Sequence, residues 1–411
     1  MNRLFITLIK LFIVSFLPAQ SSEIDRVAIK KDFDQLLFNI SEQYVYLENK
    51  NVDLDCIKSY YGDQIKKLKT EEETVLFFEY ILNEFYDSHI ILNTNRNSSF
   101  RLFSPIYASL INGKAIVTNV WQTQIEKLNQ NIIGAEVLKI NEINVNTSIK
   151  NFPSQCNDKH AQGVREWILN KVLAGRYNEP RILTLKLITG EIVQFDLDHL
   201  KIKKESTLVH SSIQDDIGII RINNSLGNNE LIEVIDNTLD TLMNTKGLII
   251  DLRNTVDGGN SYVARGIMSR FIKEPKPYQR HFTIEKYGDN PEVERSWVEY
   301  VSPRKEQYTK PLVILVGRWT GSMGEGLAIG FECMERGHIV GTEMERLAGG
   351  MSGFDFSNRN YGYRLSTVKL FHVDGTPREE YVPGNYVEQT TIAKDEVLNR
   401  GVGMIEKLLE Y

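Results

Sequence analysis

Ser322 has the residue type and the position along the chain that suit a catalytic nucleophile. It lies in the segment PLVILVGRWTGSMGEG, residues 311–326, between an apolar run at 312–316 and an expected helix that starts near Met323. A short apolar run rich in β-branched residues predicts a strand buried on both faces. The first N–H groups of a helix lack partners and favour negative charge, so they can stabilise the oxyanion formed when a serine attacks a carbonyl. The same position also suits a serine that only caps the helix.

Other segments carry groups that could serve the same reaction. His89 stands in the element Asp87-Ser88-His89, where the apolar spacing changes from that of a helix to that of a strand. An imidazole titrates near neutral pH and can act as a general base, although a lone histidine often has only a structural role. Glu325, one turn after Ser322, either lines the site or stabilises the start of the helix.

A second apolar run, GLIIDLR at residues 247–253, ends before Gly258 and Gly259. A glycine pair after a strand allows backbone N–H groups to approach a ligand closely, or simply makes a tight turn. Asp251 and Arg253 on this strand are expected to form a buried structural pair.

The chain is too long for one typical domain, and its apolar spacing changes twice. Residues 22–97 show helical spacing, with a capping box at Thr70 to Glu73. Residues 98–202 contain mostly short strands, and residues 203–411 alternate strands with helices, as α/β folds do. These changes predict a helical N-terminal region, a small β domain and an α/β domain.

Residues 1–21 have a basic start, an apolar segment and small residues at the end, which predicts a secretory signal peptide and an exported protein. No later segment is apolar enough to predict stable membrane insertion. The formal charge of −6 argues against nucleic acid as a main partner. Cys56, Cys156 and Cys333 have no metal-site spacing; export permits one disulfide among them, and Cys333 is expected to be a buried small hydrophobe.

The segments GLIIDLRNTVDGG, TGSMGE and HIVGTEMERLAGG, in this order, resemble the tail-specific, or C-terminal processing, serine peptidase family. Thr320, Ser322 and Glu325 fit its Thr-x-Ser-x-x-Glu element. The bacterial processing branch uses a lysine about 25 residues after the serine, but that region here reads RLAGG, residues 346–350. The chain is therefore more similar to the tricorn-core-like or retinoid-binding-protein-like branch, which uses a histidine from the N-terminal region.

The resemblance implies a role for each matching residue. His89 would be the general base, with possible help from Ser88, and Glu379 or Glu380 would orient the imidazole. This chain departs from the family around those glutamates, because it reads GTPREEYVPG at residues 375–384. The N–H groups of Met323 and of Gly258 or Gly259 would form the oxyanion hole.

The resemblance also implies a crotonase- or Clp-protease-like fold for the α/β catalytic domain, residues 203–411. The phrases GAEVLKIN and LTLKLITGEIVQFDL make residues 98–202 similar to a PDZ-like domain, a module that captures an extended chain end. No metal and no organic cofactor is implied.

The sequence as a whole predicts an exported, periplasmic or secreted serine endopeptidase that acts on unfolded polypeptides or C-terminal tails by a Ser-His-Glu mechanism. One alternative is a non-catalytic protein that binds peptides or apolar ligands on the same scaffold. A serine esterase of the α/β-hydrolase type is the second alternative, but its Gly-x-Ser-x-Gly elbow would require a glycine where Thr320 stands.

Overall fold

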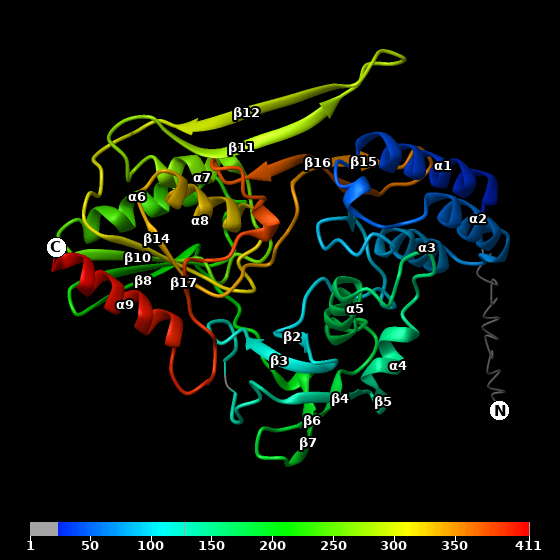
Figure 1. Cartoon of the computed structure of the whole chain (residues 1–411), viewed down its shortest axis with the longest axis horizontal. Helices are drawn as coiled ribbons and strands as arrows, with labels where there is room; N and C mark the ends of the chain where they lie inside the picture. Colours follow the sequence, from blue (N-terminus) through cyan, green and yellow to red (C-terminus); the bar gives the residue numbers. More distant parts are fainter. Residues whose placement is uncertain (1–23, 127, 411) are drawn as a thin grey trace, which may run out of the picture.

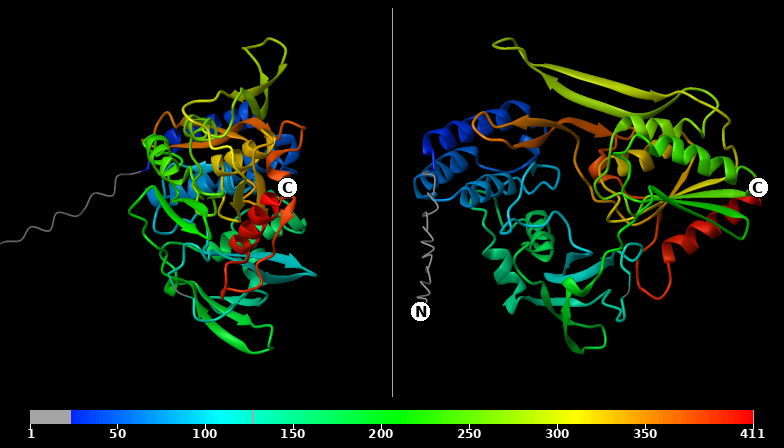
Figure 2. Two further views of the ribbon diagram at one scale, coloured as in Figure 1. Left: turned by 90° about the vertical axis from the view of Figure 1, so that its left-hand side faces the viewer. Right: turned by 180° about the vertical axis from the view of Figure 1, so that it is seen from behind.

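The computed structural model describes residues 24–126 and 128–410, and the expected signal peptide lies outside these residues. The N-terminal helices, an antiparallel sheet and a largely parallel sheet surround the middle of the molecule (Figure 1). Seen from behind, the same three parts keep this arrangement (Figure 2). Among residues 24–126 and 128–410, no helix combines the length and the apolar character that crossing a membrane requires.

The N-terminal part is helical because each helix starts at a good capping residue. Asp25 caps α1, Asp53 caps α2, and Thr70 caps α3 in the capping box with Glu73 that the sequence predicted. The helices and the short 3₁₀ turns between them are α1 (Arg26–Gln43), η1 (Leu47–Asn49), α2 (Leu54–Gln64), η2 (Ile65–Lys67) and α3 (Glu71–Asn83).

An antiparallel sheet follows, in the order β2-β3-β4-β6-β7, with the short β5 beside β4. Its apolar side chains enclose a core together with helix α5. The elements are β2 (Ile106–Ile111), β3 (Lys114–Val120), β4 (Glu136–Ile140), β5 (Ile143–Asn144), α4 (Val145–Lys150), α5 (Gln162–Ala174), β6 (Ile182–Lys186), β7 (Ile192–Asp196) and η3 (Leu197–His199). Helix α5 is a difference from the short strands expected here.

The second half of the chain builds a six-stranded sheet in the order β17-β14-β13-β10-β9-β8. It is parallel except for β8, which pairs antiparallel with β9. Alternate side chains of β10 enter different cores: Leu248 and Ile250 pack with α6, α7 and α8, whereas Ile249 packs with α9. The elements are β8 (Val209–Gln214), β9 (Ile217–Ile222), α6 (Leu231–Leu242), β10 (Gly247–Asp251), α7 (Ser261–Met268), β13 (Leu312–Val316), α8 (Met323–Cys333), β14 (His338–Gly341), β17 (Asn385–Tyr386) and α9 (Glu396–Leu409).

A third sheet joins the two ends of the molecule. Its order is β1-β16-β11-β12, with β15 also paired to β16, and the β11–β12 hairpin reaches from the α7 and α8 side toward α1 (Figure 1). Tyr363 and Leu365 of β16 belong to the same core as the N-terminal helices, so this helical region is packed onto the second half of the chain. The elements are β1 (Ile91–Leu92), β11 (Lys276–Glu285), β12 (Val293–Val301), β15 (Gly350–Asp355), β16 (Gly362–Phe371) and η4 (Arg378–Glu380).

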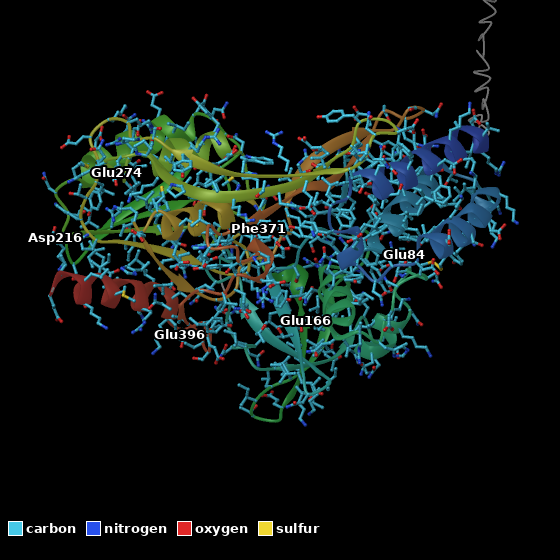
Figure 3. The ribbon with its side chains drawn as sticks, turned by 45° about the horizontal axis from the view of Figure 1, so that its top comes forward. Glu84, Glu166, Asp216, Glu274, Phe371 and Glu396 are labelled. Atoms are coloured by element: carbon cyan, nitrogen blue, oxygen red, sulfur yellow. A yellow bond between two sulfur atoms is a disulfide. The ribbon has the colours of Figure 1, made fainter. Side chains whose placement is uncertain are left out.

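Specific contacts connect the parts. A disulfide joins Cys56 of α2 to Cys156, which precedes α5, while Cys333 is a buried free thiol as expected. Beside the disulfide, the buried carboxylate of Glu84 accepts hydrogen bonds from the N–H groups of Gln155 and Cys156; Figure 3 labels Glu84 near the N-terminal helices. Elsewhere, Trp121, which directly follows β3, stacks on Trp319, three residues before Ser322.

Candidate active site

Ser322 occupies the turn between β13 and α8, where its backbone has φ 49° and ψ −111°. A positive φ is unfavourable for a residue with a side chain, so the surrounding contacts must hold it. The N–H of Ser322 donates to Glu325 Oε1 at 3.0 Å, and the buried Thr320 hydroxyl donates to the Leu252 carbonyl at 3.0 Å. The turn is thus fixed on both sides of the serine.

His89 comes from the other end of the chain and meets this serine. Its Nε2 lies 3.2 Å from Ser322 Oγ, and its Nδ1 lies 3.0 Å from the carbonyl oxygen of Ala348. A carbonyl only accepts hydrogen bonds, so Nδ1 carries the proton and Nε2 presents its lone pair to the serine hydroxyl. The backbone N–H of His89 donates to Asp87 Oδ1 at 2.8 Å, and Asp87 in turn accepts from the Tyr44 hydroxyl.

Burial and the nearby Arg378 guanidinium lower the pKa of His89 to about 4. The imidazole is therefore neutral at neutral pH, which is the state that a general base requires.

The structure places the expected orienting carboxylates away from the imidazole. Glu379 accepts a hydrogen bond from the Tyr46 hydroxyl, and Glu380 is exposed; the Ala348 carbonyl takes the Nδ1 proton in their place. The 3₁₀ turn η4 directs Arg378 inward, where it donates to the carbonyls of Leu347 and Gly349. The arginine next to the expected glutamates therefore fixes the loop that holds the histidine.

Two further groups complete this support. The Ser366 hydroxyl donates to the Ala348 carbonyl at 2.6 Å, so that one oxygen accepts from both Ser366 and His89. Ser88 does not bond the imidazole: its hydroxyl accepts from the Trp167 indole N–H at 3.1 Å. Sequence reasoning missed Ala348, Ser366 and Arg378, and the only signal was the position of Arg378 beside Glu379.

The glycine pair lies against the nucleophile. A Cβ atom on Gly258, whose φ is +64°, would come within 2.4 Å of the Ser322 Cβ, so glycine is required for this approach. The Gly258 N–H donates to the Thr255 carbonyl and is thereby occupied. Within the part of the chain that the structure describes, the N–H groups of Gly259 and Met323 have no acceptor, so they are the two candidates left for an oxyanion hole.

Glu325 is completely buried and bridges two loops instead of lining a cavity. Its Oε1 accepts from the N–H groups of Ser322 and Leu347, at 3.0 and 2.9 Å. Burial raises its pKa to about 7. The expected pair Asp251–Arg253 is confirmed beneath the glycine loop: both carboxylate oxygens accept from the guanidinium, and the pKa of Asp251 is lowered by this partner despite its burial.

A cavity of about 620 Å³ is lined by Asp87, Ser88 and Ala348, which lie next to His89, although His89 and Ser322 are not themselves among its lining residues. One wall comes from β2 and α5, including Glu166, which Figure 3 labels at the middle of the molecule. The lining also includes residues 318–319, 345–346 and 348, and Asp87 and Ser88, which directly precede His89 in the chain. Among the residues that the structure describes, no cluster of three or more His, Cys, Asp or Glu side chains is arranged to hold a metal ion.

Comparisons with known proteins concern the fold of the chain and the family of its second half. Residues 216–386 match the model of Peptidase family S41. The fold is similar to that of mature CPAF complexed with lactacystin, with a TM-score of 0.62 and 14% identity over 93% of this chain and 98% of the other. The photosystem II D1 C-terminal processing protease gives a TM-score of 0.52 and 13% identity over 88% of this chain and 92% of its own. No curated protein matches the sequence.

These solved structures share the fold, with mixed α/β sheets and helices, and the family model covers both the glycine loop and the serine turn. By this match residues 216–386 form a Peptidase family S41 domain, and together with the peptidase structures that share its fold it identifies the chain as a serine-type peptidase.

Proposed function

We propose that this chain is an exported serine endopeptidase that cleaves unfolded polypeptides or C-terminal tails, with Ser322 as nucleophile and His89 as general base. The 3.2 Å contact between His89 Nε2 and Ser322 Oγ carries the proposal, because it joins a neutral imidazole to a hydroxyl at the start of a helix. The polypeptide substrate would occupy the cavity beside this pair.

In the first step, His89 Nε2 takes the hydroxyl proton while Ser322 Oγ attacks the peptide carbonyl. The N–H groups of Met323 and Gly259 stabilise the oxyanion. His89 then returns the proton to the leaving amine, and water releases the acyl group by the same path. The Ala348 carbonyl keeps Nδ1 protonated throughout, so this version of the mechanism replaces the expected Ser-His-Glu triad with a Ser–His pair oriented by a backbone oxygen.

Three further expectations belong to this proposal: the PDZ-like domain, the crotonase- or Clp-like domain and export. The antiparallel sheet with α5 supports a PDZ-like role for residues 98–202, in which they present an extended chain to the cavity. The six-stranded sheet β17-β14-β13-β10-β9-β8 has helices on both faces, which supports a crotonase- or Clp-like domain at residues 203–411. The Cys56–Cys156 disulfide supports export, since such bonds persist in oxidising compartments.

The test combines labelling with cleavage. A fluorophosphonate probe should label the purified protein covalently at Ser322, and the protein should cleave unfolded casein. Ser322→Ala should lose both the label and the cleavage while keeping its circular dichroism spectrum. Binding of casein without labelling or cleavage would instead support the non-catalytic alternative and overturn the peptidase mechanism.

A further inference from the structure

Glu345 is a carboxyl group that the proposed reaction does not use. It lines the cavity beside the Ser322–His89 pair, together with three other carboxylates. Asp87 accepts from Tyr44 and from the His89 N–H, Glu166 accepts from Tyr107, and Glu379 accepts from Tyr46. The Glu345 carboxyl has no hydrogen-bond donor within the described part of the chain, and its Oε2 is enclosed. It is therefore the unpartnered carboxyl of this cavity.

Its position places it next to the bond to be cleaved. The backbone N–H of Glu345 donates to the Thr320 carbonyl at 3.0 Å. A Cβ atom on Gly321, the residue before the nucleophile, would lie 2.3 Å from Glu345 Oε2. A substrate group held by this carboxyl would thus lie within a residue or two of the scissile bond.

No basic side chain of the cavity neutralises Glu345. The Arg318 guanidinium lies over the Tyr107 ring and 3.5 Å from Glu343, and Arg346 lies 3.8 Å from the same Glu343 carboxylate. The other two basic residues lie elsewhere: Lys50 is 3.8 Å from Asp87, and Lys171 faces the Trp167 ring. Burial, with Glu325 and Asp257 adding negative charge, raises the pKa of Glu345.

A buried carboxylate without a counter-ion is unfavourable, and a cationic group that enters the cavity would relieve this. We propose that Glu345 receives a lysine or arginine side chain of the polypeptide substrate and gives the peptidase a preference for basic residues beside the cleaved bond. This inference rests on the proposed function and names the substrate class of the same site. Glu345 acts here as a specificity determinant and takes no part in proton transfer at Ser322.

The first test maps the cleavage sites in unfolded casein by mass spectrometry. Lysine and arginine should be enriched at one position within two residues of the cleaved bonds. Paired quenched peptides with lysine or norleucine at that position should differ in kcat/KM by about tenfold or more, and Glu345→Gln should bring the ratio close to one. Cleavage sites without basic enrichment, or an unchanged ratio in Glu345→Gln, would overturn the inference.

The pH dependence of this ratio adds a readout that a merely structural role would not produce. Because the pKa of Glu345 is raised in the free protein, the preference for lysine should grow as pH rises and the carboxyl ionises. In Glu345→Gln the ratio should be independent of pH. Glu343→Gln is the matched control, since Glu343 already has arginine partners and lies outside the cavity lining; its ratio should stay that of the wild type.

A binding measurement separates this inference from the proposed function. If the wild type cleaves nothing, the peptidase mechanism fails, but Ser322→Ala still offers the cavity. A fluorescent dodecapeptide with one central lysine should bind Ser322→Ala more tightly in anisotropy titrations than the same peptide with norleucine, and Glu345→Gln in that background should remove the difference. Equal affinities for the two peptides would overturn the basic-residue site whatever the outcome with casein.

Discussion

The two halves of the Ser322–His89 pair are held in different ways. The side chains that fix the serine belong to its own segment: Thr320 bonds the turn to the Leu252 carbonyl at the end of the neighbouring strand, and Glu325 accepts from the serine N–H. The histidine is fixed partly from distant segments: Asp87, two residues before it, is itself held by Tyr44, and the Ala348 carbonyl comes from a segment 259 positions further along the chain.

The histidine side also depends on a second layer. Arg378 and Ser366 both hold the 347–349 loop, and neither touches His89 in the hydrogen-bond network. A local turn keeps its geometry when one distant residue changes, whereas a site assembled from separate segments transmits any loosening to the imidazole. The serine half should therefore tolerate remote substitutions better than the histidine half.

Removing either side chain of the pair should give the largest loss of activity, and the two losses should be about equal. Ser322→Ala and His89→Ala should each lower kcat on a quenched peptide by about 10⁴-fold or more, because the nucleophile and its base act as one unit. The double variant should be no slower than the single ones. A His89→Ala protein with near wild-type kcat and an intact circular dichroism spectrum would remove His89 from the mechanism.

The next test removes hydrogen bonds that hold only the loop around His89. Arg378→Met leaves two buried carbonyls unpaired, which should lower the free energy of unfolding by roughly 3 kcal/mol in urea titrations. It also removes a positive charge that lowers the pKa of His89, so the acid limb of kcat/KM, expected near pH 4 in the wild type, should move to higher pH.

Arg336→Met is the matched control for this change, since Arg336 also donates to backbone carbonyls, those of Phe271, Tyr308 and Lys310, away from the pair. It should cost similar stability and leave the acid limb in place. An acid limb that moves equally in both variants would show that general destabilisation, and not the 347–349 loop, sets the behaviour of His89.

The same difference between local contacts and contacts from distant segments decides what the sequence could predict. Strand 312–316, the serine turn and the Asp251–Arg253 pair were readable because each depends on residues close together in the chain. The partner of His89 was not readable, because it is a backbone carbonyl and every residue has one. The turn of η4 that directs Arg378 inward and leaves Glu380 exposed depends equally on tertiary packing.

Helix α5 escaped prediction for a different reason. Its buried residues Val164, Ile168, Leu169 and Leu173 do follow helical spacing, but they stand between segments that alternate like strands. The disulfide partner of Cys56 is 100 residues away, and only the packing of α2 against the segment before α5 selects Cys156 over Cys333. Contacts between distant segments thus account for what the sequence left open.

Glu325→Gln tests the connection between the serine turn and the 347–349 loop, because the Glu325 carboxyl accepts hydrogen bonds from the N–H groups of both Ser322 and Leu347. Its pKa of about 7 lies above the ordinary value of 4.5, so the folded protein keeps a proton that the unfolded chain loses between these values. Its contribution to stability is therefore present below pH 4.5 and declines as pH rises toward 7, by roughly 3 kcal/mol. Urea titrations at pH 5 and 8 should show a correspondingly smaller difference in Glu325→Gln, and the same pH dependence in both proteins would contradict the assignment.

Ser366→Ala should give the smallest change in stability and activity, because it removes only one contact behind the histidine. The Ala348 carbonyl loses one of its two donors but keeps the His89 Nδ1 proton, so the imidazole stays in its tautomer. The free energy of unfolding should fall by about 1 kcal/mol, and kcat should change by less than about threefold. The measurement is a urea titration together with initial rates on the same quenched peptide. A fall in kcat well beyond threefold would mean that the hydroxyl itself, and not the loop, orients His89 through the shared oxygen.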